Sequence, residues 1–293
     1  MPAPSITLTA PAKINLSLRL LGRRSDGYHE IETLMAPITL ADELEITHRH
    51  GADPGTITLS CNEPSLPTGE ENLCVKAARA FQDASGIQDA IAITLLKNIP
   101  HGAGLGGGSS DAAAVLRGIN TLFNEPLVAE ELQLLAASLG SDIPFFLQEK
   151  PAWCRGRGEQ LTEAAPLSSW NLLLIKPPFS VDTTWAYKAW DQKTWLHEAP
   201  ITIDGIPIFN DLEAPVFEKY LLLPVLKKWL LEQSEVKVAW MSGSGSTMVT
   251  LLKNELSETQ ITEFTTAIAA NFGTSFWIKK VMFPHAPQEK EHS

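Results

Sequence analysis

The densest chemical signal in the sequence is a glycine-rich run over residues 102–111, which reads GAGLGGGSSD. An alternating apolar segment at residues 90–96 precedes it, and an alanine-rich helical pattern follows from Asp111 to about Leu122. A strand, a glycine loop and a helix N-terminus together present unpaired amides and the positive end of a helix dipole to an anion. Glycine is costly in chain entropy, so this density indicates positive φ or close backbone approach rather than a loose surface loop. We therefore expect a phosphate to bind here.

The two familiar phosphate loops do not fit this run. Residues 102–107 match the dinucleotide fingerprint G-x-G-x-x-G formally, but that pattern is weak alone. A dinucleotide-binding unit needs a parallel strand after the helix, whereas a second helix is expected here over residues 127–139. The Walker A pattern fails because no lysine precedes Ser109 or Ser110. We infer a third kind of loop, whose lysine comes from elsewhere in the chain.

Two pairs of polar residues near the N-terminus are candidates for binding. Lys13 and Asn15 lie two positions apart in an extended segment, residues 5–21, so both side chains face the same side, opposite to the apolar set. Tyr28 and His29 follow an Asp-Gly turn, and such a pair can stack on and hydrogen-bond a nucleobase. Ordinary alternatives stay open: solvated positions for the first pair, and a surface turn with a packing tyrosine for the second.

Two further sites have equally plain alternatives. Ser141 and Asp142 open a turn or short helix that runs to Phe146, where either residue could be an N-cap worth roughly 1 kcal/mol. His48 and His50 could share one face of a strand as metal ligands. The sequence offers no evident third ligand for them, so we expect no metal site there.

Periodicity predicts two halves that position these residues. The second half restarts at a buried strand, residues 172–175, and its strand-helix alternation suggests an α/β sandwich. Strands are expected at 5–21, 31–46, 56–60, 90–96, 172–175, 236–240, 248–252 and 276–282, with a hairpin at 153–161. Helices are expected at 72–84, 111–122, 127–139, 183–190, 220–232 and 258–272, with another opening at 210–213.

Composition limits the classes of partner. The 293 residues are 44% hydrophobic and carry a net charge of −11, which disfavours nucleic acid and anionic membrane surfaces. No apolar run approaches the roughly 18 residues of a membrane helix, and no signal peptide is evident. Three cysteines without paired spacing fit a reducing cytoplasm. We expect a cytoplasmic protein with a small-molecule substrate, in which an anion is held locally by lysines, amides and a metal ion.

The glycine-rich run resembles that of a known enzyme superfamily. Residues 100–110, PHGAGLGGGSS, are similar to the phosphate motif of the GHMP kinases, which include galactokinase, homoserine kinase, mevalonate kinase and phosphomevalonate kinase. Further motifs resemble one branch of the superfamily, which acts in the non-mevalonate isoprenoid pathway. They are PAKINL at 11–16, DGYH at 26–29, GSDIPF at 140–145, NDLE at 210–213 and SGSGS at 242–246. The resemblance covers nearly the whole chain.

This resemblance implies an α+β, two-domain GHMP-kinase fold. Residues 1–167 would form an N-terminal domain like domain 2 of ribosomal protein S5 and would carry the ATP loop. Residues 168–293 would form a ferredoxin-like α/β domain. The implied reaction moves the γ-phosphoryl group of ATP to the 2-hydroxyl of a cytidine diphosphate ester of methylerythritol. A monomer or a weak homodimer is expected.

The resemblance also implies catalytic and ATP-binding residues. Asp142 would take the proton of the 2-hydroxyl, and Lys13 would keep that carboxylate ionised and stabilise charge on the transferring group. Mg²⁺ would accompany ATP, bound by phosphate oxygens and water rather than by a protein metal site. Lys97 would reach the nucleotide unless it is simply solvated. The other ATP-binding residues implied are Pro100, Gly104, Leu105, Gly106, Gly107, Gly108, Ser109 and Ser110.

For the second substrate, the resemblance implies a cytosine pocket and a diphosphate pocket. Tyr28 and His29 would bind the cytosine, with Tyr187 as the opposing ring. Asn15 and Thr183 would help to hold the erythritol diphosphate. The tryptophan-containing stretch at 189–208 matches no motif, and the arginines at 155 and 157 receive no role.

Overall fold

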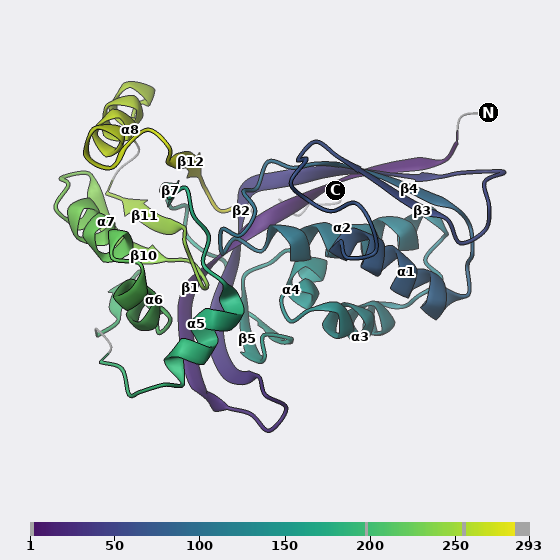
Figure 1. The fold of residues 1–293 in the computed structure, drawn as a ribbon, viewed down its shortest axis with the longest axis horizontal. Helices are drawn as coiled ribbons and strands as arrows, with labels where there is room; N and C mark the ends of the chain where they lie inside the picture. The colour runs from purple at the N-terminus through teal and green to yellow at the C-terminus, as the bar shows by residue number, and fades with distance from the viewer. Residues whose placement is uncertain (1–2, 197–198, 254–255, 285–293) are drawn as a thin grey trace, which may run out of the picture.

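The computed structural model describes residues 3–196, 199–253 and 256–284. Figure 1 shows two halves side by side. In the first, a long twisted sheet lies over helices α1 to α4; in the second, a smaller sheet carries α6, α7 and α8 on its outer side. The helix α5 lies between the two halves, beside β1.

The elements of the first half agree closely with the predicted ones. Its strands are β1 (Ser5–Arg23), β2 (His29–His48), β3 (Ile57–Cys61), β4 (Ile91–Leu96), β5 (Ala152–Gly156) and β6 (Gln160–Glu163). Its helices are α1 (Leu73–Ser85), α2 (Gly107–Leu122), α3 (Ala129–Leu139) and α4 (Ile143–Gln148). One predicted boundary was wrong: α2 begins at Gly107 rather than at Asp111. The last glycines of the run therefore belong to the first helical turn.

A long hairpin of β1 and β2 organises the large sheet. β4 and β5 both pair with β2, β3 pairs with β4, and β6 pairs with β5. Register shifts between Pro11 and Lys13, and between Asn15 and Ser17, mark irregularities in β1. Such bulges re-aim side chains. Here they flank the two polar positions that the sequence singled out.

The helix α2 packs closely against this sheet because the contacting residues are small. The alanines at 112–114 are completely buried. A Cβ atom on Gly118 would lie 2.5 Å from Ile46 and 2.7 Å from Leu8, so the helix could not approach the sheet this closely with a larger residue. This packing fixes the helix N-terminus beside β1.

The second half contains the remaining elements. Its strands are β7 (Leu172–Lys176), β8 (Ile201–Ile203), β9 (Ile206–Asn210), β10 (Val236–Met241), β11 (Met248–Leu252) and β12 (Trp277–Val281). Its helices are α5 (Thr183–Trp190), α6 (Glu213–Lys219), α7 (Leu222–Leu231) and α8 (Glu258–Phe272). No helix within the described ranges is long and apolar enough to cross a bilayer.

The smaller sheet has a ferredoxin-like arrangement. Its strand order is β10-β11-β7-β12, and each pairing is antiparallel. Helices follow β7 and β11, which gives the strand-helix-strand-strand-helix-strand pattern of that fold. The predicted α+β class with an α/β second half is confirmed.

The hairpin of β8 and β9 was missed by the sequence reading. Most of it lies in the stretch 189–208 that matched no motif, and β9 pairs in parallel with β1 through Ser17 and Phe209. A strand from the second half thus extends the large sheet. One apolar cluster also joins the two sheets, with Ile14 and Leu16 packed together with Trp240. The division at residues 167 and 168 stays a prediction.

Candidate active site

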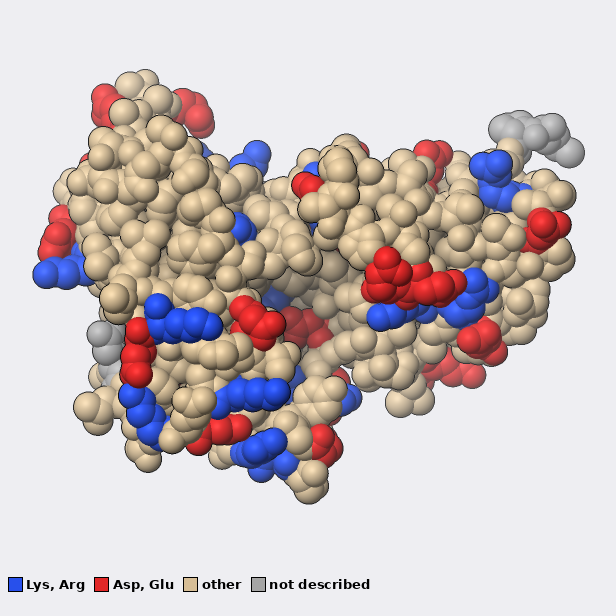
Figure 2. Space-filling model, in the orientation of Figure 1, with Lys and Arg blue, Asp and Glu red and all other residues tan. Residues whose placement is uncertain are grey.

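A cavity of about 800 Å³ lies where the two halves meet. Figure 2 shows the surface hollowed at this place. The cavity is lined by β1, β2, the glycine-rich run, the residues that begin α4, and α5. Nearly all predicted site residues line it: Lys13, Asn15, Tyr28, His29, Lys97, Pro100, Gly104, Leu105, Gly106, Gly107, Gly108, Ser109, Asp142, Thr183 and Tyr187. Segments far apart in the sequence therefore meet at one site.

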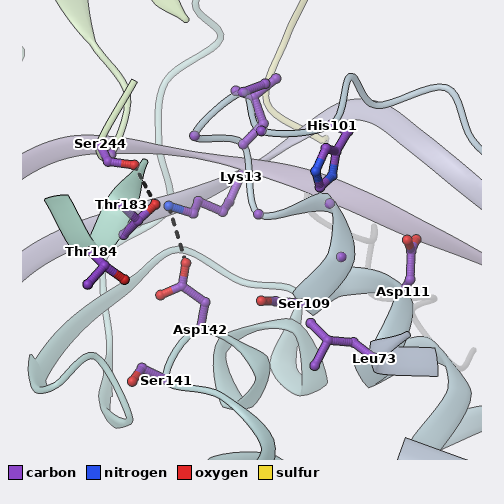
Figure 3. Close-up of a pocket in the computed structure, with 18 of the residues that line it drawn as sticks. Lys13, Leu73, His101, Ser109, Asp111, Ser141, Asp142, Thr183, Thr184 and Ser244 are labelled. Carbon is purple, nitrogen blue, oxygen red and sulfur yellow. Dashed lines mark hydrogen bonds and ion pairs between the residues drawn. The ribbon is translucent and has the colours of Figure 1, made fainter. Parts of the chain in front are cut away.

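Lys13 and Asp142 form an ion pair inside this cavity. The Lys13 Nζ lies 3.5 Å from Asp142 Oδ2, and Figure 3 shows the two side chains pointing toward one another. Lys13 also donates to Asn15 Oδ1 at 2.7 Å, and Asn15 Nδ2 donates to Thr33 Oγ1 at 2.8 Å. Lys13 and Asn15 are buried, so the interpretation of solvated positions was wrong. The contacts with Asn15 and Thr33, on strands of the large sheet, hold the Lys13 ammonium in place.

Asp142 is available for chemistry rather than for capping. It occupies the N-cap position of α4, yet among the described residues its side chain makes no capping hydrogen bond. Its side chain is 32% exposed, whereas that of Lys13 is 5% exposed. The interpretation of Asp142 as a plain N-cap was therefore wrong. The buried ammonium of Lys13 therefore faces the carboxylate of Asp142, which a ligand in the cavity can reach.

The glycine-rich run forms a tight turn that delivers the N-terminus of α2 to the cavity. Gly104 and Gly106 have φ angles of +76° and +72°, a region that favours glycine. A Cβ atom on Gly106 would lie 2.7 Å from Phe146 Cζ and 3.1 Å from Lys13 Cγ and Cε. The turn is tied to β1, because the Lys13 amide donates to the Leu105 carbonyl at 3.0 Å. The first-turn amides of α2 thus open onto the cavity, which suits an anion.

Motifs of the second half hold this turn from the other side. Ser242 Oγ donates to the Gly104 carbonyl at 3.1 Å. A Cβ atom on Gly104 would lie 2.4 Å from the Ser242 carbonyl oxygen, so the two loops touch through their backbones. Asn210 Nδ2 donates to the carbonyls of Met241 and Gly243, each at 2.7 Å. The NDLE and SGSGS motifs therefore support the glycine-rich turn at residues 104–109.

Ser110 lies outside the cavity lining, which corrects one predicted role. Its hydroxyl donates to the Pro11 carbonyl at 2.7 Å, and the residue is buried. Its side chain ties α2 to β1 instead of facing a phosphate. Ser109, one position earlier, does line the cavity.

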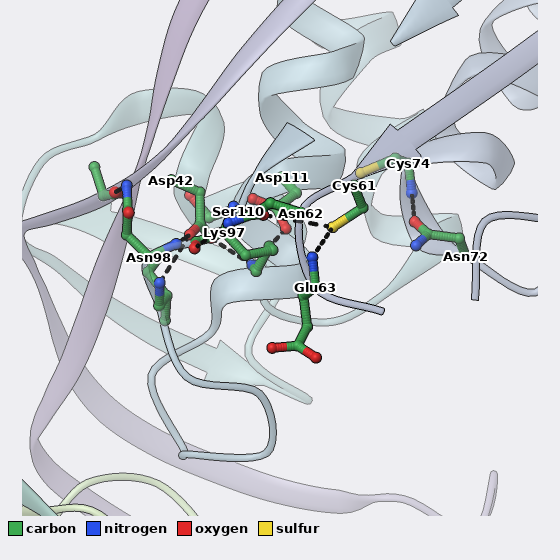
Figure 4. Close-up of polar contacts among 12 residues, drawn as sticks. Asp42, Cys61, Asn62, Glu63, Asn72, Cys74, Lys97, Asn98, Ser110 and Asp111 are labelled. Atoms are coloured by element: carbon green, nitrogen blue, oxygen red, sulfur yellow. Dashed lines mark hydrogen bonds and ion pairs between the residues drawn. The ribbon is translucent and has the colours of Figure 1, made fainter. Parts of the chain in front are cut away.

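Lys97 is buried in a cluster with two carboxylates, so the interpretation of a solvated lysine was also wrong. Its Nζ pairs with Asp42 Oδ2 and lies 2.7 Å from Asp111 Oδ2 (Figure 4). Asp42 additionally accepts hydrogen bonds from the amides of Asn98 and Ile99, at 2.5 and 2.8 Å. The cluster joins β2, the segment after β4 and the first turns of α2.

Burial governs the protonation of this cluster. Desolvation raises the pKa of Asp111 to about 7; Lys97 opposes this shift and Asp42 adds to it. Burial by itself lowers the pKa of Lys97, but the two carboxylates outweigh it and raise that pKa above its ordinary value. Among the described residues, Asp111 Oδ1 has no hydrogen-bond partner. The ammonium of Lys97 is therefore shared between the carboxyl groups of Asp42 and Asp111.

Tyr28, His29 and Tyr187 gather at the end of the cavity formed by α5. Tyr28 is 53% exposed, with the guanidinium carbon of Arg157 4.8 Å from its ring centroid. Tyr187 was expected as the ring opposing Tyr28 and His29, and its ring packs against the buried His29, with centroids 5.2 Å apart. Burial raises the pKa of Tyr187 above its ordinary value. This end of the cavity therefore presents an exposed tyrosine ring beside a buried pair of aromatic rings.

Three contacts here were missed by the sequence reading: those of Arg157, Asp191 and Ser244. Asp191 Oδ1 lies 2.7 Å from His29 Nε2, and Thr183 Oγ1 lies 2.8 Å from Ser244 Oγ. The SGSGS motif gave a signal for Ser244, whereas Asp191 belongs to the stretch without a motif. Elsewhere, the rings of His48 and His50 lie 4.0 Å apart, and His48 Nε2 pairs with Asp89. No cluster suited to a metal ion occurs in the described part of the chain.

Comparison with known proteins identifies the family. The model of the GHMP kinases N terminal domain matches residues 72–150. A 4-diphosphocytidyl-2-C-methyl-D-erythritol kinase of Methylacidiphilum infernorum (isolate V4) is 47% identical over 253 residues, which are 84% of this chain and 86% of that protein. The chain belongs to this kinase family. The kinase of the same name from Chlorobium chlorochromatii (strain CaD3) is 40% identical over 83% of this chain and 87% of its own length.

Solved structures agree with this assignment to the 4-diphosphocytidyl-2-C-methyl-D-erythritol kinases. A crystal structure of 4-(cytidine 5'-diphospho)-2C-methyl-D-erythritol kinase superposes with a TM-score of 0.75 at 33% identity, covering 95% of this chain and all of the other. A homoserine kinase from Cytophaga hutchinsonii has a TM-score of 0.68 at 18% identity, which shows the shared fold alone. The predicted superfamily, branch and two-domain GHMP fold are confirmed.

Proposed function

We propose that this kinase transfers the γ-phosphoryl group of ATP to the 2-hydroxyl of 4-diphosphocytidyl-2-C-methyl-D-erythritol. The observation that carries the proposal is the pairing of Lys13 with an accessible Asp142 beside the N-terminus of α2. Tyr28 and His29 line the same cavity, so a base and a phosphate chain can occupy it together. The family to which the chain belongs supports this choice of substrate.

The reaction asks for positioning and charge stabilisation more than for covalent chemistry. The oxygen of the 2-hydroxyl attacks the γ-phosphorus, the bond from that phosphorus to the β,γ-bridging oxygen breaks, and ADP leaves. Asp142 accepts the proton that the hydroxyl loses. Lys13 lies 3.5 Å from that carboxylate, where its charge stabilises both Asp142 and the negative oxygens of the group in transfer.

The turn at Gly104 to Ser109 would hold the phosphates of ATP. Its helix amides and the Ser109 hydroxyl are donors, and a Cβ atom on Gly108 would meet only Leu73 Cδ1, at 3.7 Å. The space over this turn therefore suits phosphate oxygens. Mg²⁺, when bound, would neutralise phosphate charge, held mainly through phosphate oxygens and water as this ion prefers. The residues present fit that arrangement, because they supply donors for the anion and the accessible Asp142 carboxylate lies nearby.

Further roles for site residues, the location of the protein and its oligomeric state are also proposed. Lys97 borders the cavity and supports the nucleotide end, and Thr183 with Asn15 lies where the erythritol diphosphate would extend. The protein is proposed to work in the cytoplasm, where a reducing medium would keep its three free cysteines as thiols. A monomer or weak homodimer is proposed, with small molecules as its ligands.

A panel of acceptor substrates tests the proposal. Purified protein with ATP and Mg²⁺ is offered 4-diphosphocytidyl-2-C-methyl-D-erythritol, homoserine or mevalonate, and ADP release is followed by a coupled assay. We expect turnover on the cytidyl substrate alone, because Tyr28 and His29 have no base to bind in the other two. Turnover on homoserine or mevalonate without turnover on the cytidyl substrate would overturn the assignment.

A further inference from the structure

The imidazole of His29 is clamped by residues from the C-terminal end of α5. Its Nε2 lies 2.7 Å from Asp191 Oδ1. The rings of Tyr187 and Trp190 pack against it, with centroids at 5.2 and 6.0 Å, the second edge-on at 86°. Asp191 itself is the C-cap residue of α5, and its other oxygen lies 3.9 Å from Arg23 Nε. One helix end therefore fixes both the position and the rotation of this ring.

An ionised carboxylate can only accept hydrogen bonds, so Asp191 determines where the proton of His29 resides. A neutral imidazole beside it carries its proton on Nε2, which leaves Nδ1 as an acceptor. Among the described residues, no group hydrogen-bonds to His29 Nδ1. This atom is also not one of the fully buried polar atoms without a partner, so it is accessible. Because His29 lines the cavity, a ligand there can use Nδ1.

An acceptor at this point distinguishes two pyrimidines. Cytosine carries an exocyclic amine, which donates, where uracil carries a carbonyl oxygen, which accepts. A site built to hydrogen-bond one group rejects an analogue that leaves its polar atoms unpaired. We propose that Asp191 is a specificity-determining positioning residue, which holds His29 in the tautomer that selects cytosine over uracil. This inference rests on the proposed function, since it concerns the base of that substrate.

Asp191 lies in the stretch 189–208 that no motif of the family covers. Its contact with His29 joins β2 to the residue that ends α5. The same helix supplies Thr183, which pairs with Ser244. A change at Asp191 therefore acts on the ring of His29 without touching Lys13 or Asp142.

The test compares the cytidyl substrate with its uridyl analogue in the wild-type protein and in Asp191→Ala. The variant removes the acceptor, and it should lower the ratio of kcat/KM for cytidyl over uridyl substrate roughly tenfold. The loss should appear in KM, with kcat changed less than about twofold, because the reacting groups stay in place. Asp191→Glu should restore part of the ratio.

Asp89→Ala is the matched control. Asp89 Oδ1 also lies 2.7 Å from a histidine Nε2, that of His48, which does not line the cavity. This variant should keep the wild-type ratio. An unchanged ratio in Asp191→Ala, in protein whose thermal unfolding matches the wild type, would overturn the inference.

A measurement on the wild-type protein keeps the inference testable if the variants fail to fold. Long-range ¹H–¹⁵N spectra of the histidine rings, assigned by comparison with His29→Gln, should show His29 protonated on Nε2 and bare at Nδ1. A ring protonated on Nδ1, or on both nitrogens, would overturn the inference. A wild-type protein that shows the expected tautomer but no turnover on the cytidyl substrate would instead contradict the proposed function.

Discussion

Lys13 and Asp142 come from different layers of the first half, yet their charged atoms lie 3.5 Å apart. Lys13 projects from an irregular part of β1, and Asp142 precedes α4. Gly106 lies directly over the stem of Lys13, where a Cβ atom would be 3.1 Å from it. The ion pair and the phosphate turn are therefore one structural unit. A change in the turn is expected to displace the lysine as well.

Replacing Asp142 by asparagine should remove the proton acceptor and leave the phosphate turn intact. We expect kcat to fall by about 10²–10⁴-fold, which is the usual contribution of a positioned base. The affinity for ATP, measured by calorimetry, should change little, because the amides of α2 remain. Asp83→Asn, an exposed change on α1, is the control for loss of a negative charge. Wild-type turnover in Asp142→Asn would show that another group takes the proton.

Alanine at Gly104 and at Gly108 should have different effects. At Gly104, φ is +76° and the new methyl would meet the Ser242 carbonyl at 2.4 Å, so we expect roughly 1–3 kcal/mol of lost stability.

At Gly108, the nearest atom would be Leu73 Cδ1 at 3.7 Å, and the position is helical. Stability should hold within about 1 kcal/mol, because alanine favours the helix. The KM for ATP should rise about tenfold, because the methyl occupies the space where phosphate oxygens approach the amides. Thermal unfolding and ATP kinetics on both variants check the pair. A stable Gly104→Ala, or an unstable Gly108→Ala, would contradict the geometry.

Asp111 should make the stability of the protein depend on pH. Its pKa is raised from 3.8 to about 7 by burial. Between these values the folded state retains a proton that the unfolded chain has released, so the free energy of unfolding falls as pH rises from about 4 to about 7. The asparagine side chain in Asp111→Asn does not titrate, so the variant loses this pH dependence. Its stability relative to the wild type should therefore increase between pH 5 and pH 8, by on the order of 1 kcal/mol or more.

Denaturant unfolding at several pH values measures this difference directly. The exposed control Asp83→Asn should show a difference from the wild type that stays nearly constant over the same range. A constant difference for Asp111→Asn would mean that Asp111 is ionised in the folded state throughout.

The three cysteines should differ sharply in reactivity. Burial raises the pKa of Cys154 to about 12 and that of Cys74 well above its ordinary value, whereas Cys61 is partly exposed. The thiolate is the reactive form, so a disulfide reagent at pH 8 should titrate about one thiol per native chain rapidly. Cys61→Ser should abolish that rapid phase, and guanidinium should release the other two thiols. Rapid reaction of all three in the native protein would contradict the burial of Cys74 and Cys154.

Sequence periodicity located the elements where the apolar pattern was strong. The predicted helix at 183–190 has the same bounds as α5, and the long alternation at 5–21 is β1. The start of α2 was missed because glycine is a poor helix former. There the helix is fixed by packing of its alanines against the sheet. The hairpin of β8 and β9 was missed because three-residue β8 is too short for a periodic signal.

The candidate site was largely predicted from motifs, but its supporting contacts were not. Lysine is usually exposed, so the buried position of Lys97 between two acids had no sequence signal. The contact of His29 with Asp191 joins segments that only the folded chain brings together. Likewise, the motif implied a phosphate contact for Ser110, whereas the helical rotation turns its hydroxyl to the Pro11 carbonyl.

The destination of the phosphoryl group is the most direct test of the central claim. The wild-type protein is incubated with ATP, Mg²⁺ and 4-diphosphocytidyl-2-C-methyl-D-erythritol, and the products are followed by ³¹P NMR with and without proton decoupling. The proposed reaction predicts one new phosphomonoester signal that shows no three-bond splitting by protons, because C2 of the erythritol carries no hydrogen, together with one equivalent of ADP. A phosphomonoester signal split by carbinol protons, or inorganic phosphate as the sole product of ATP, would contradict it.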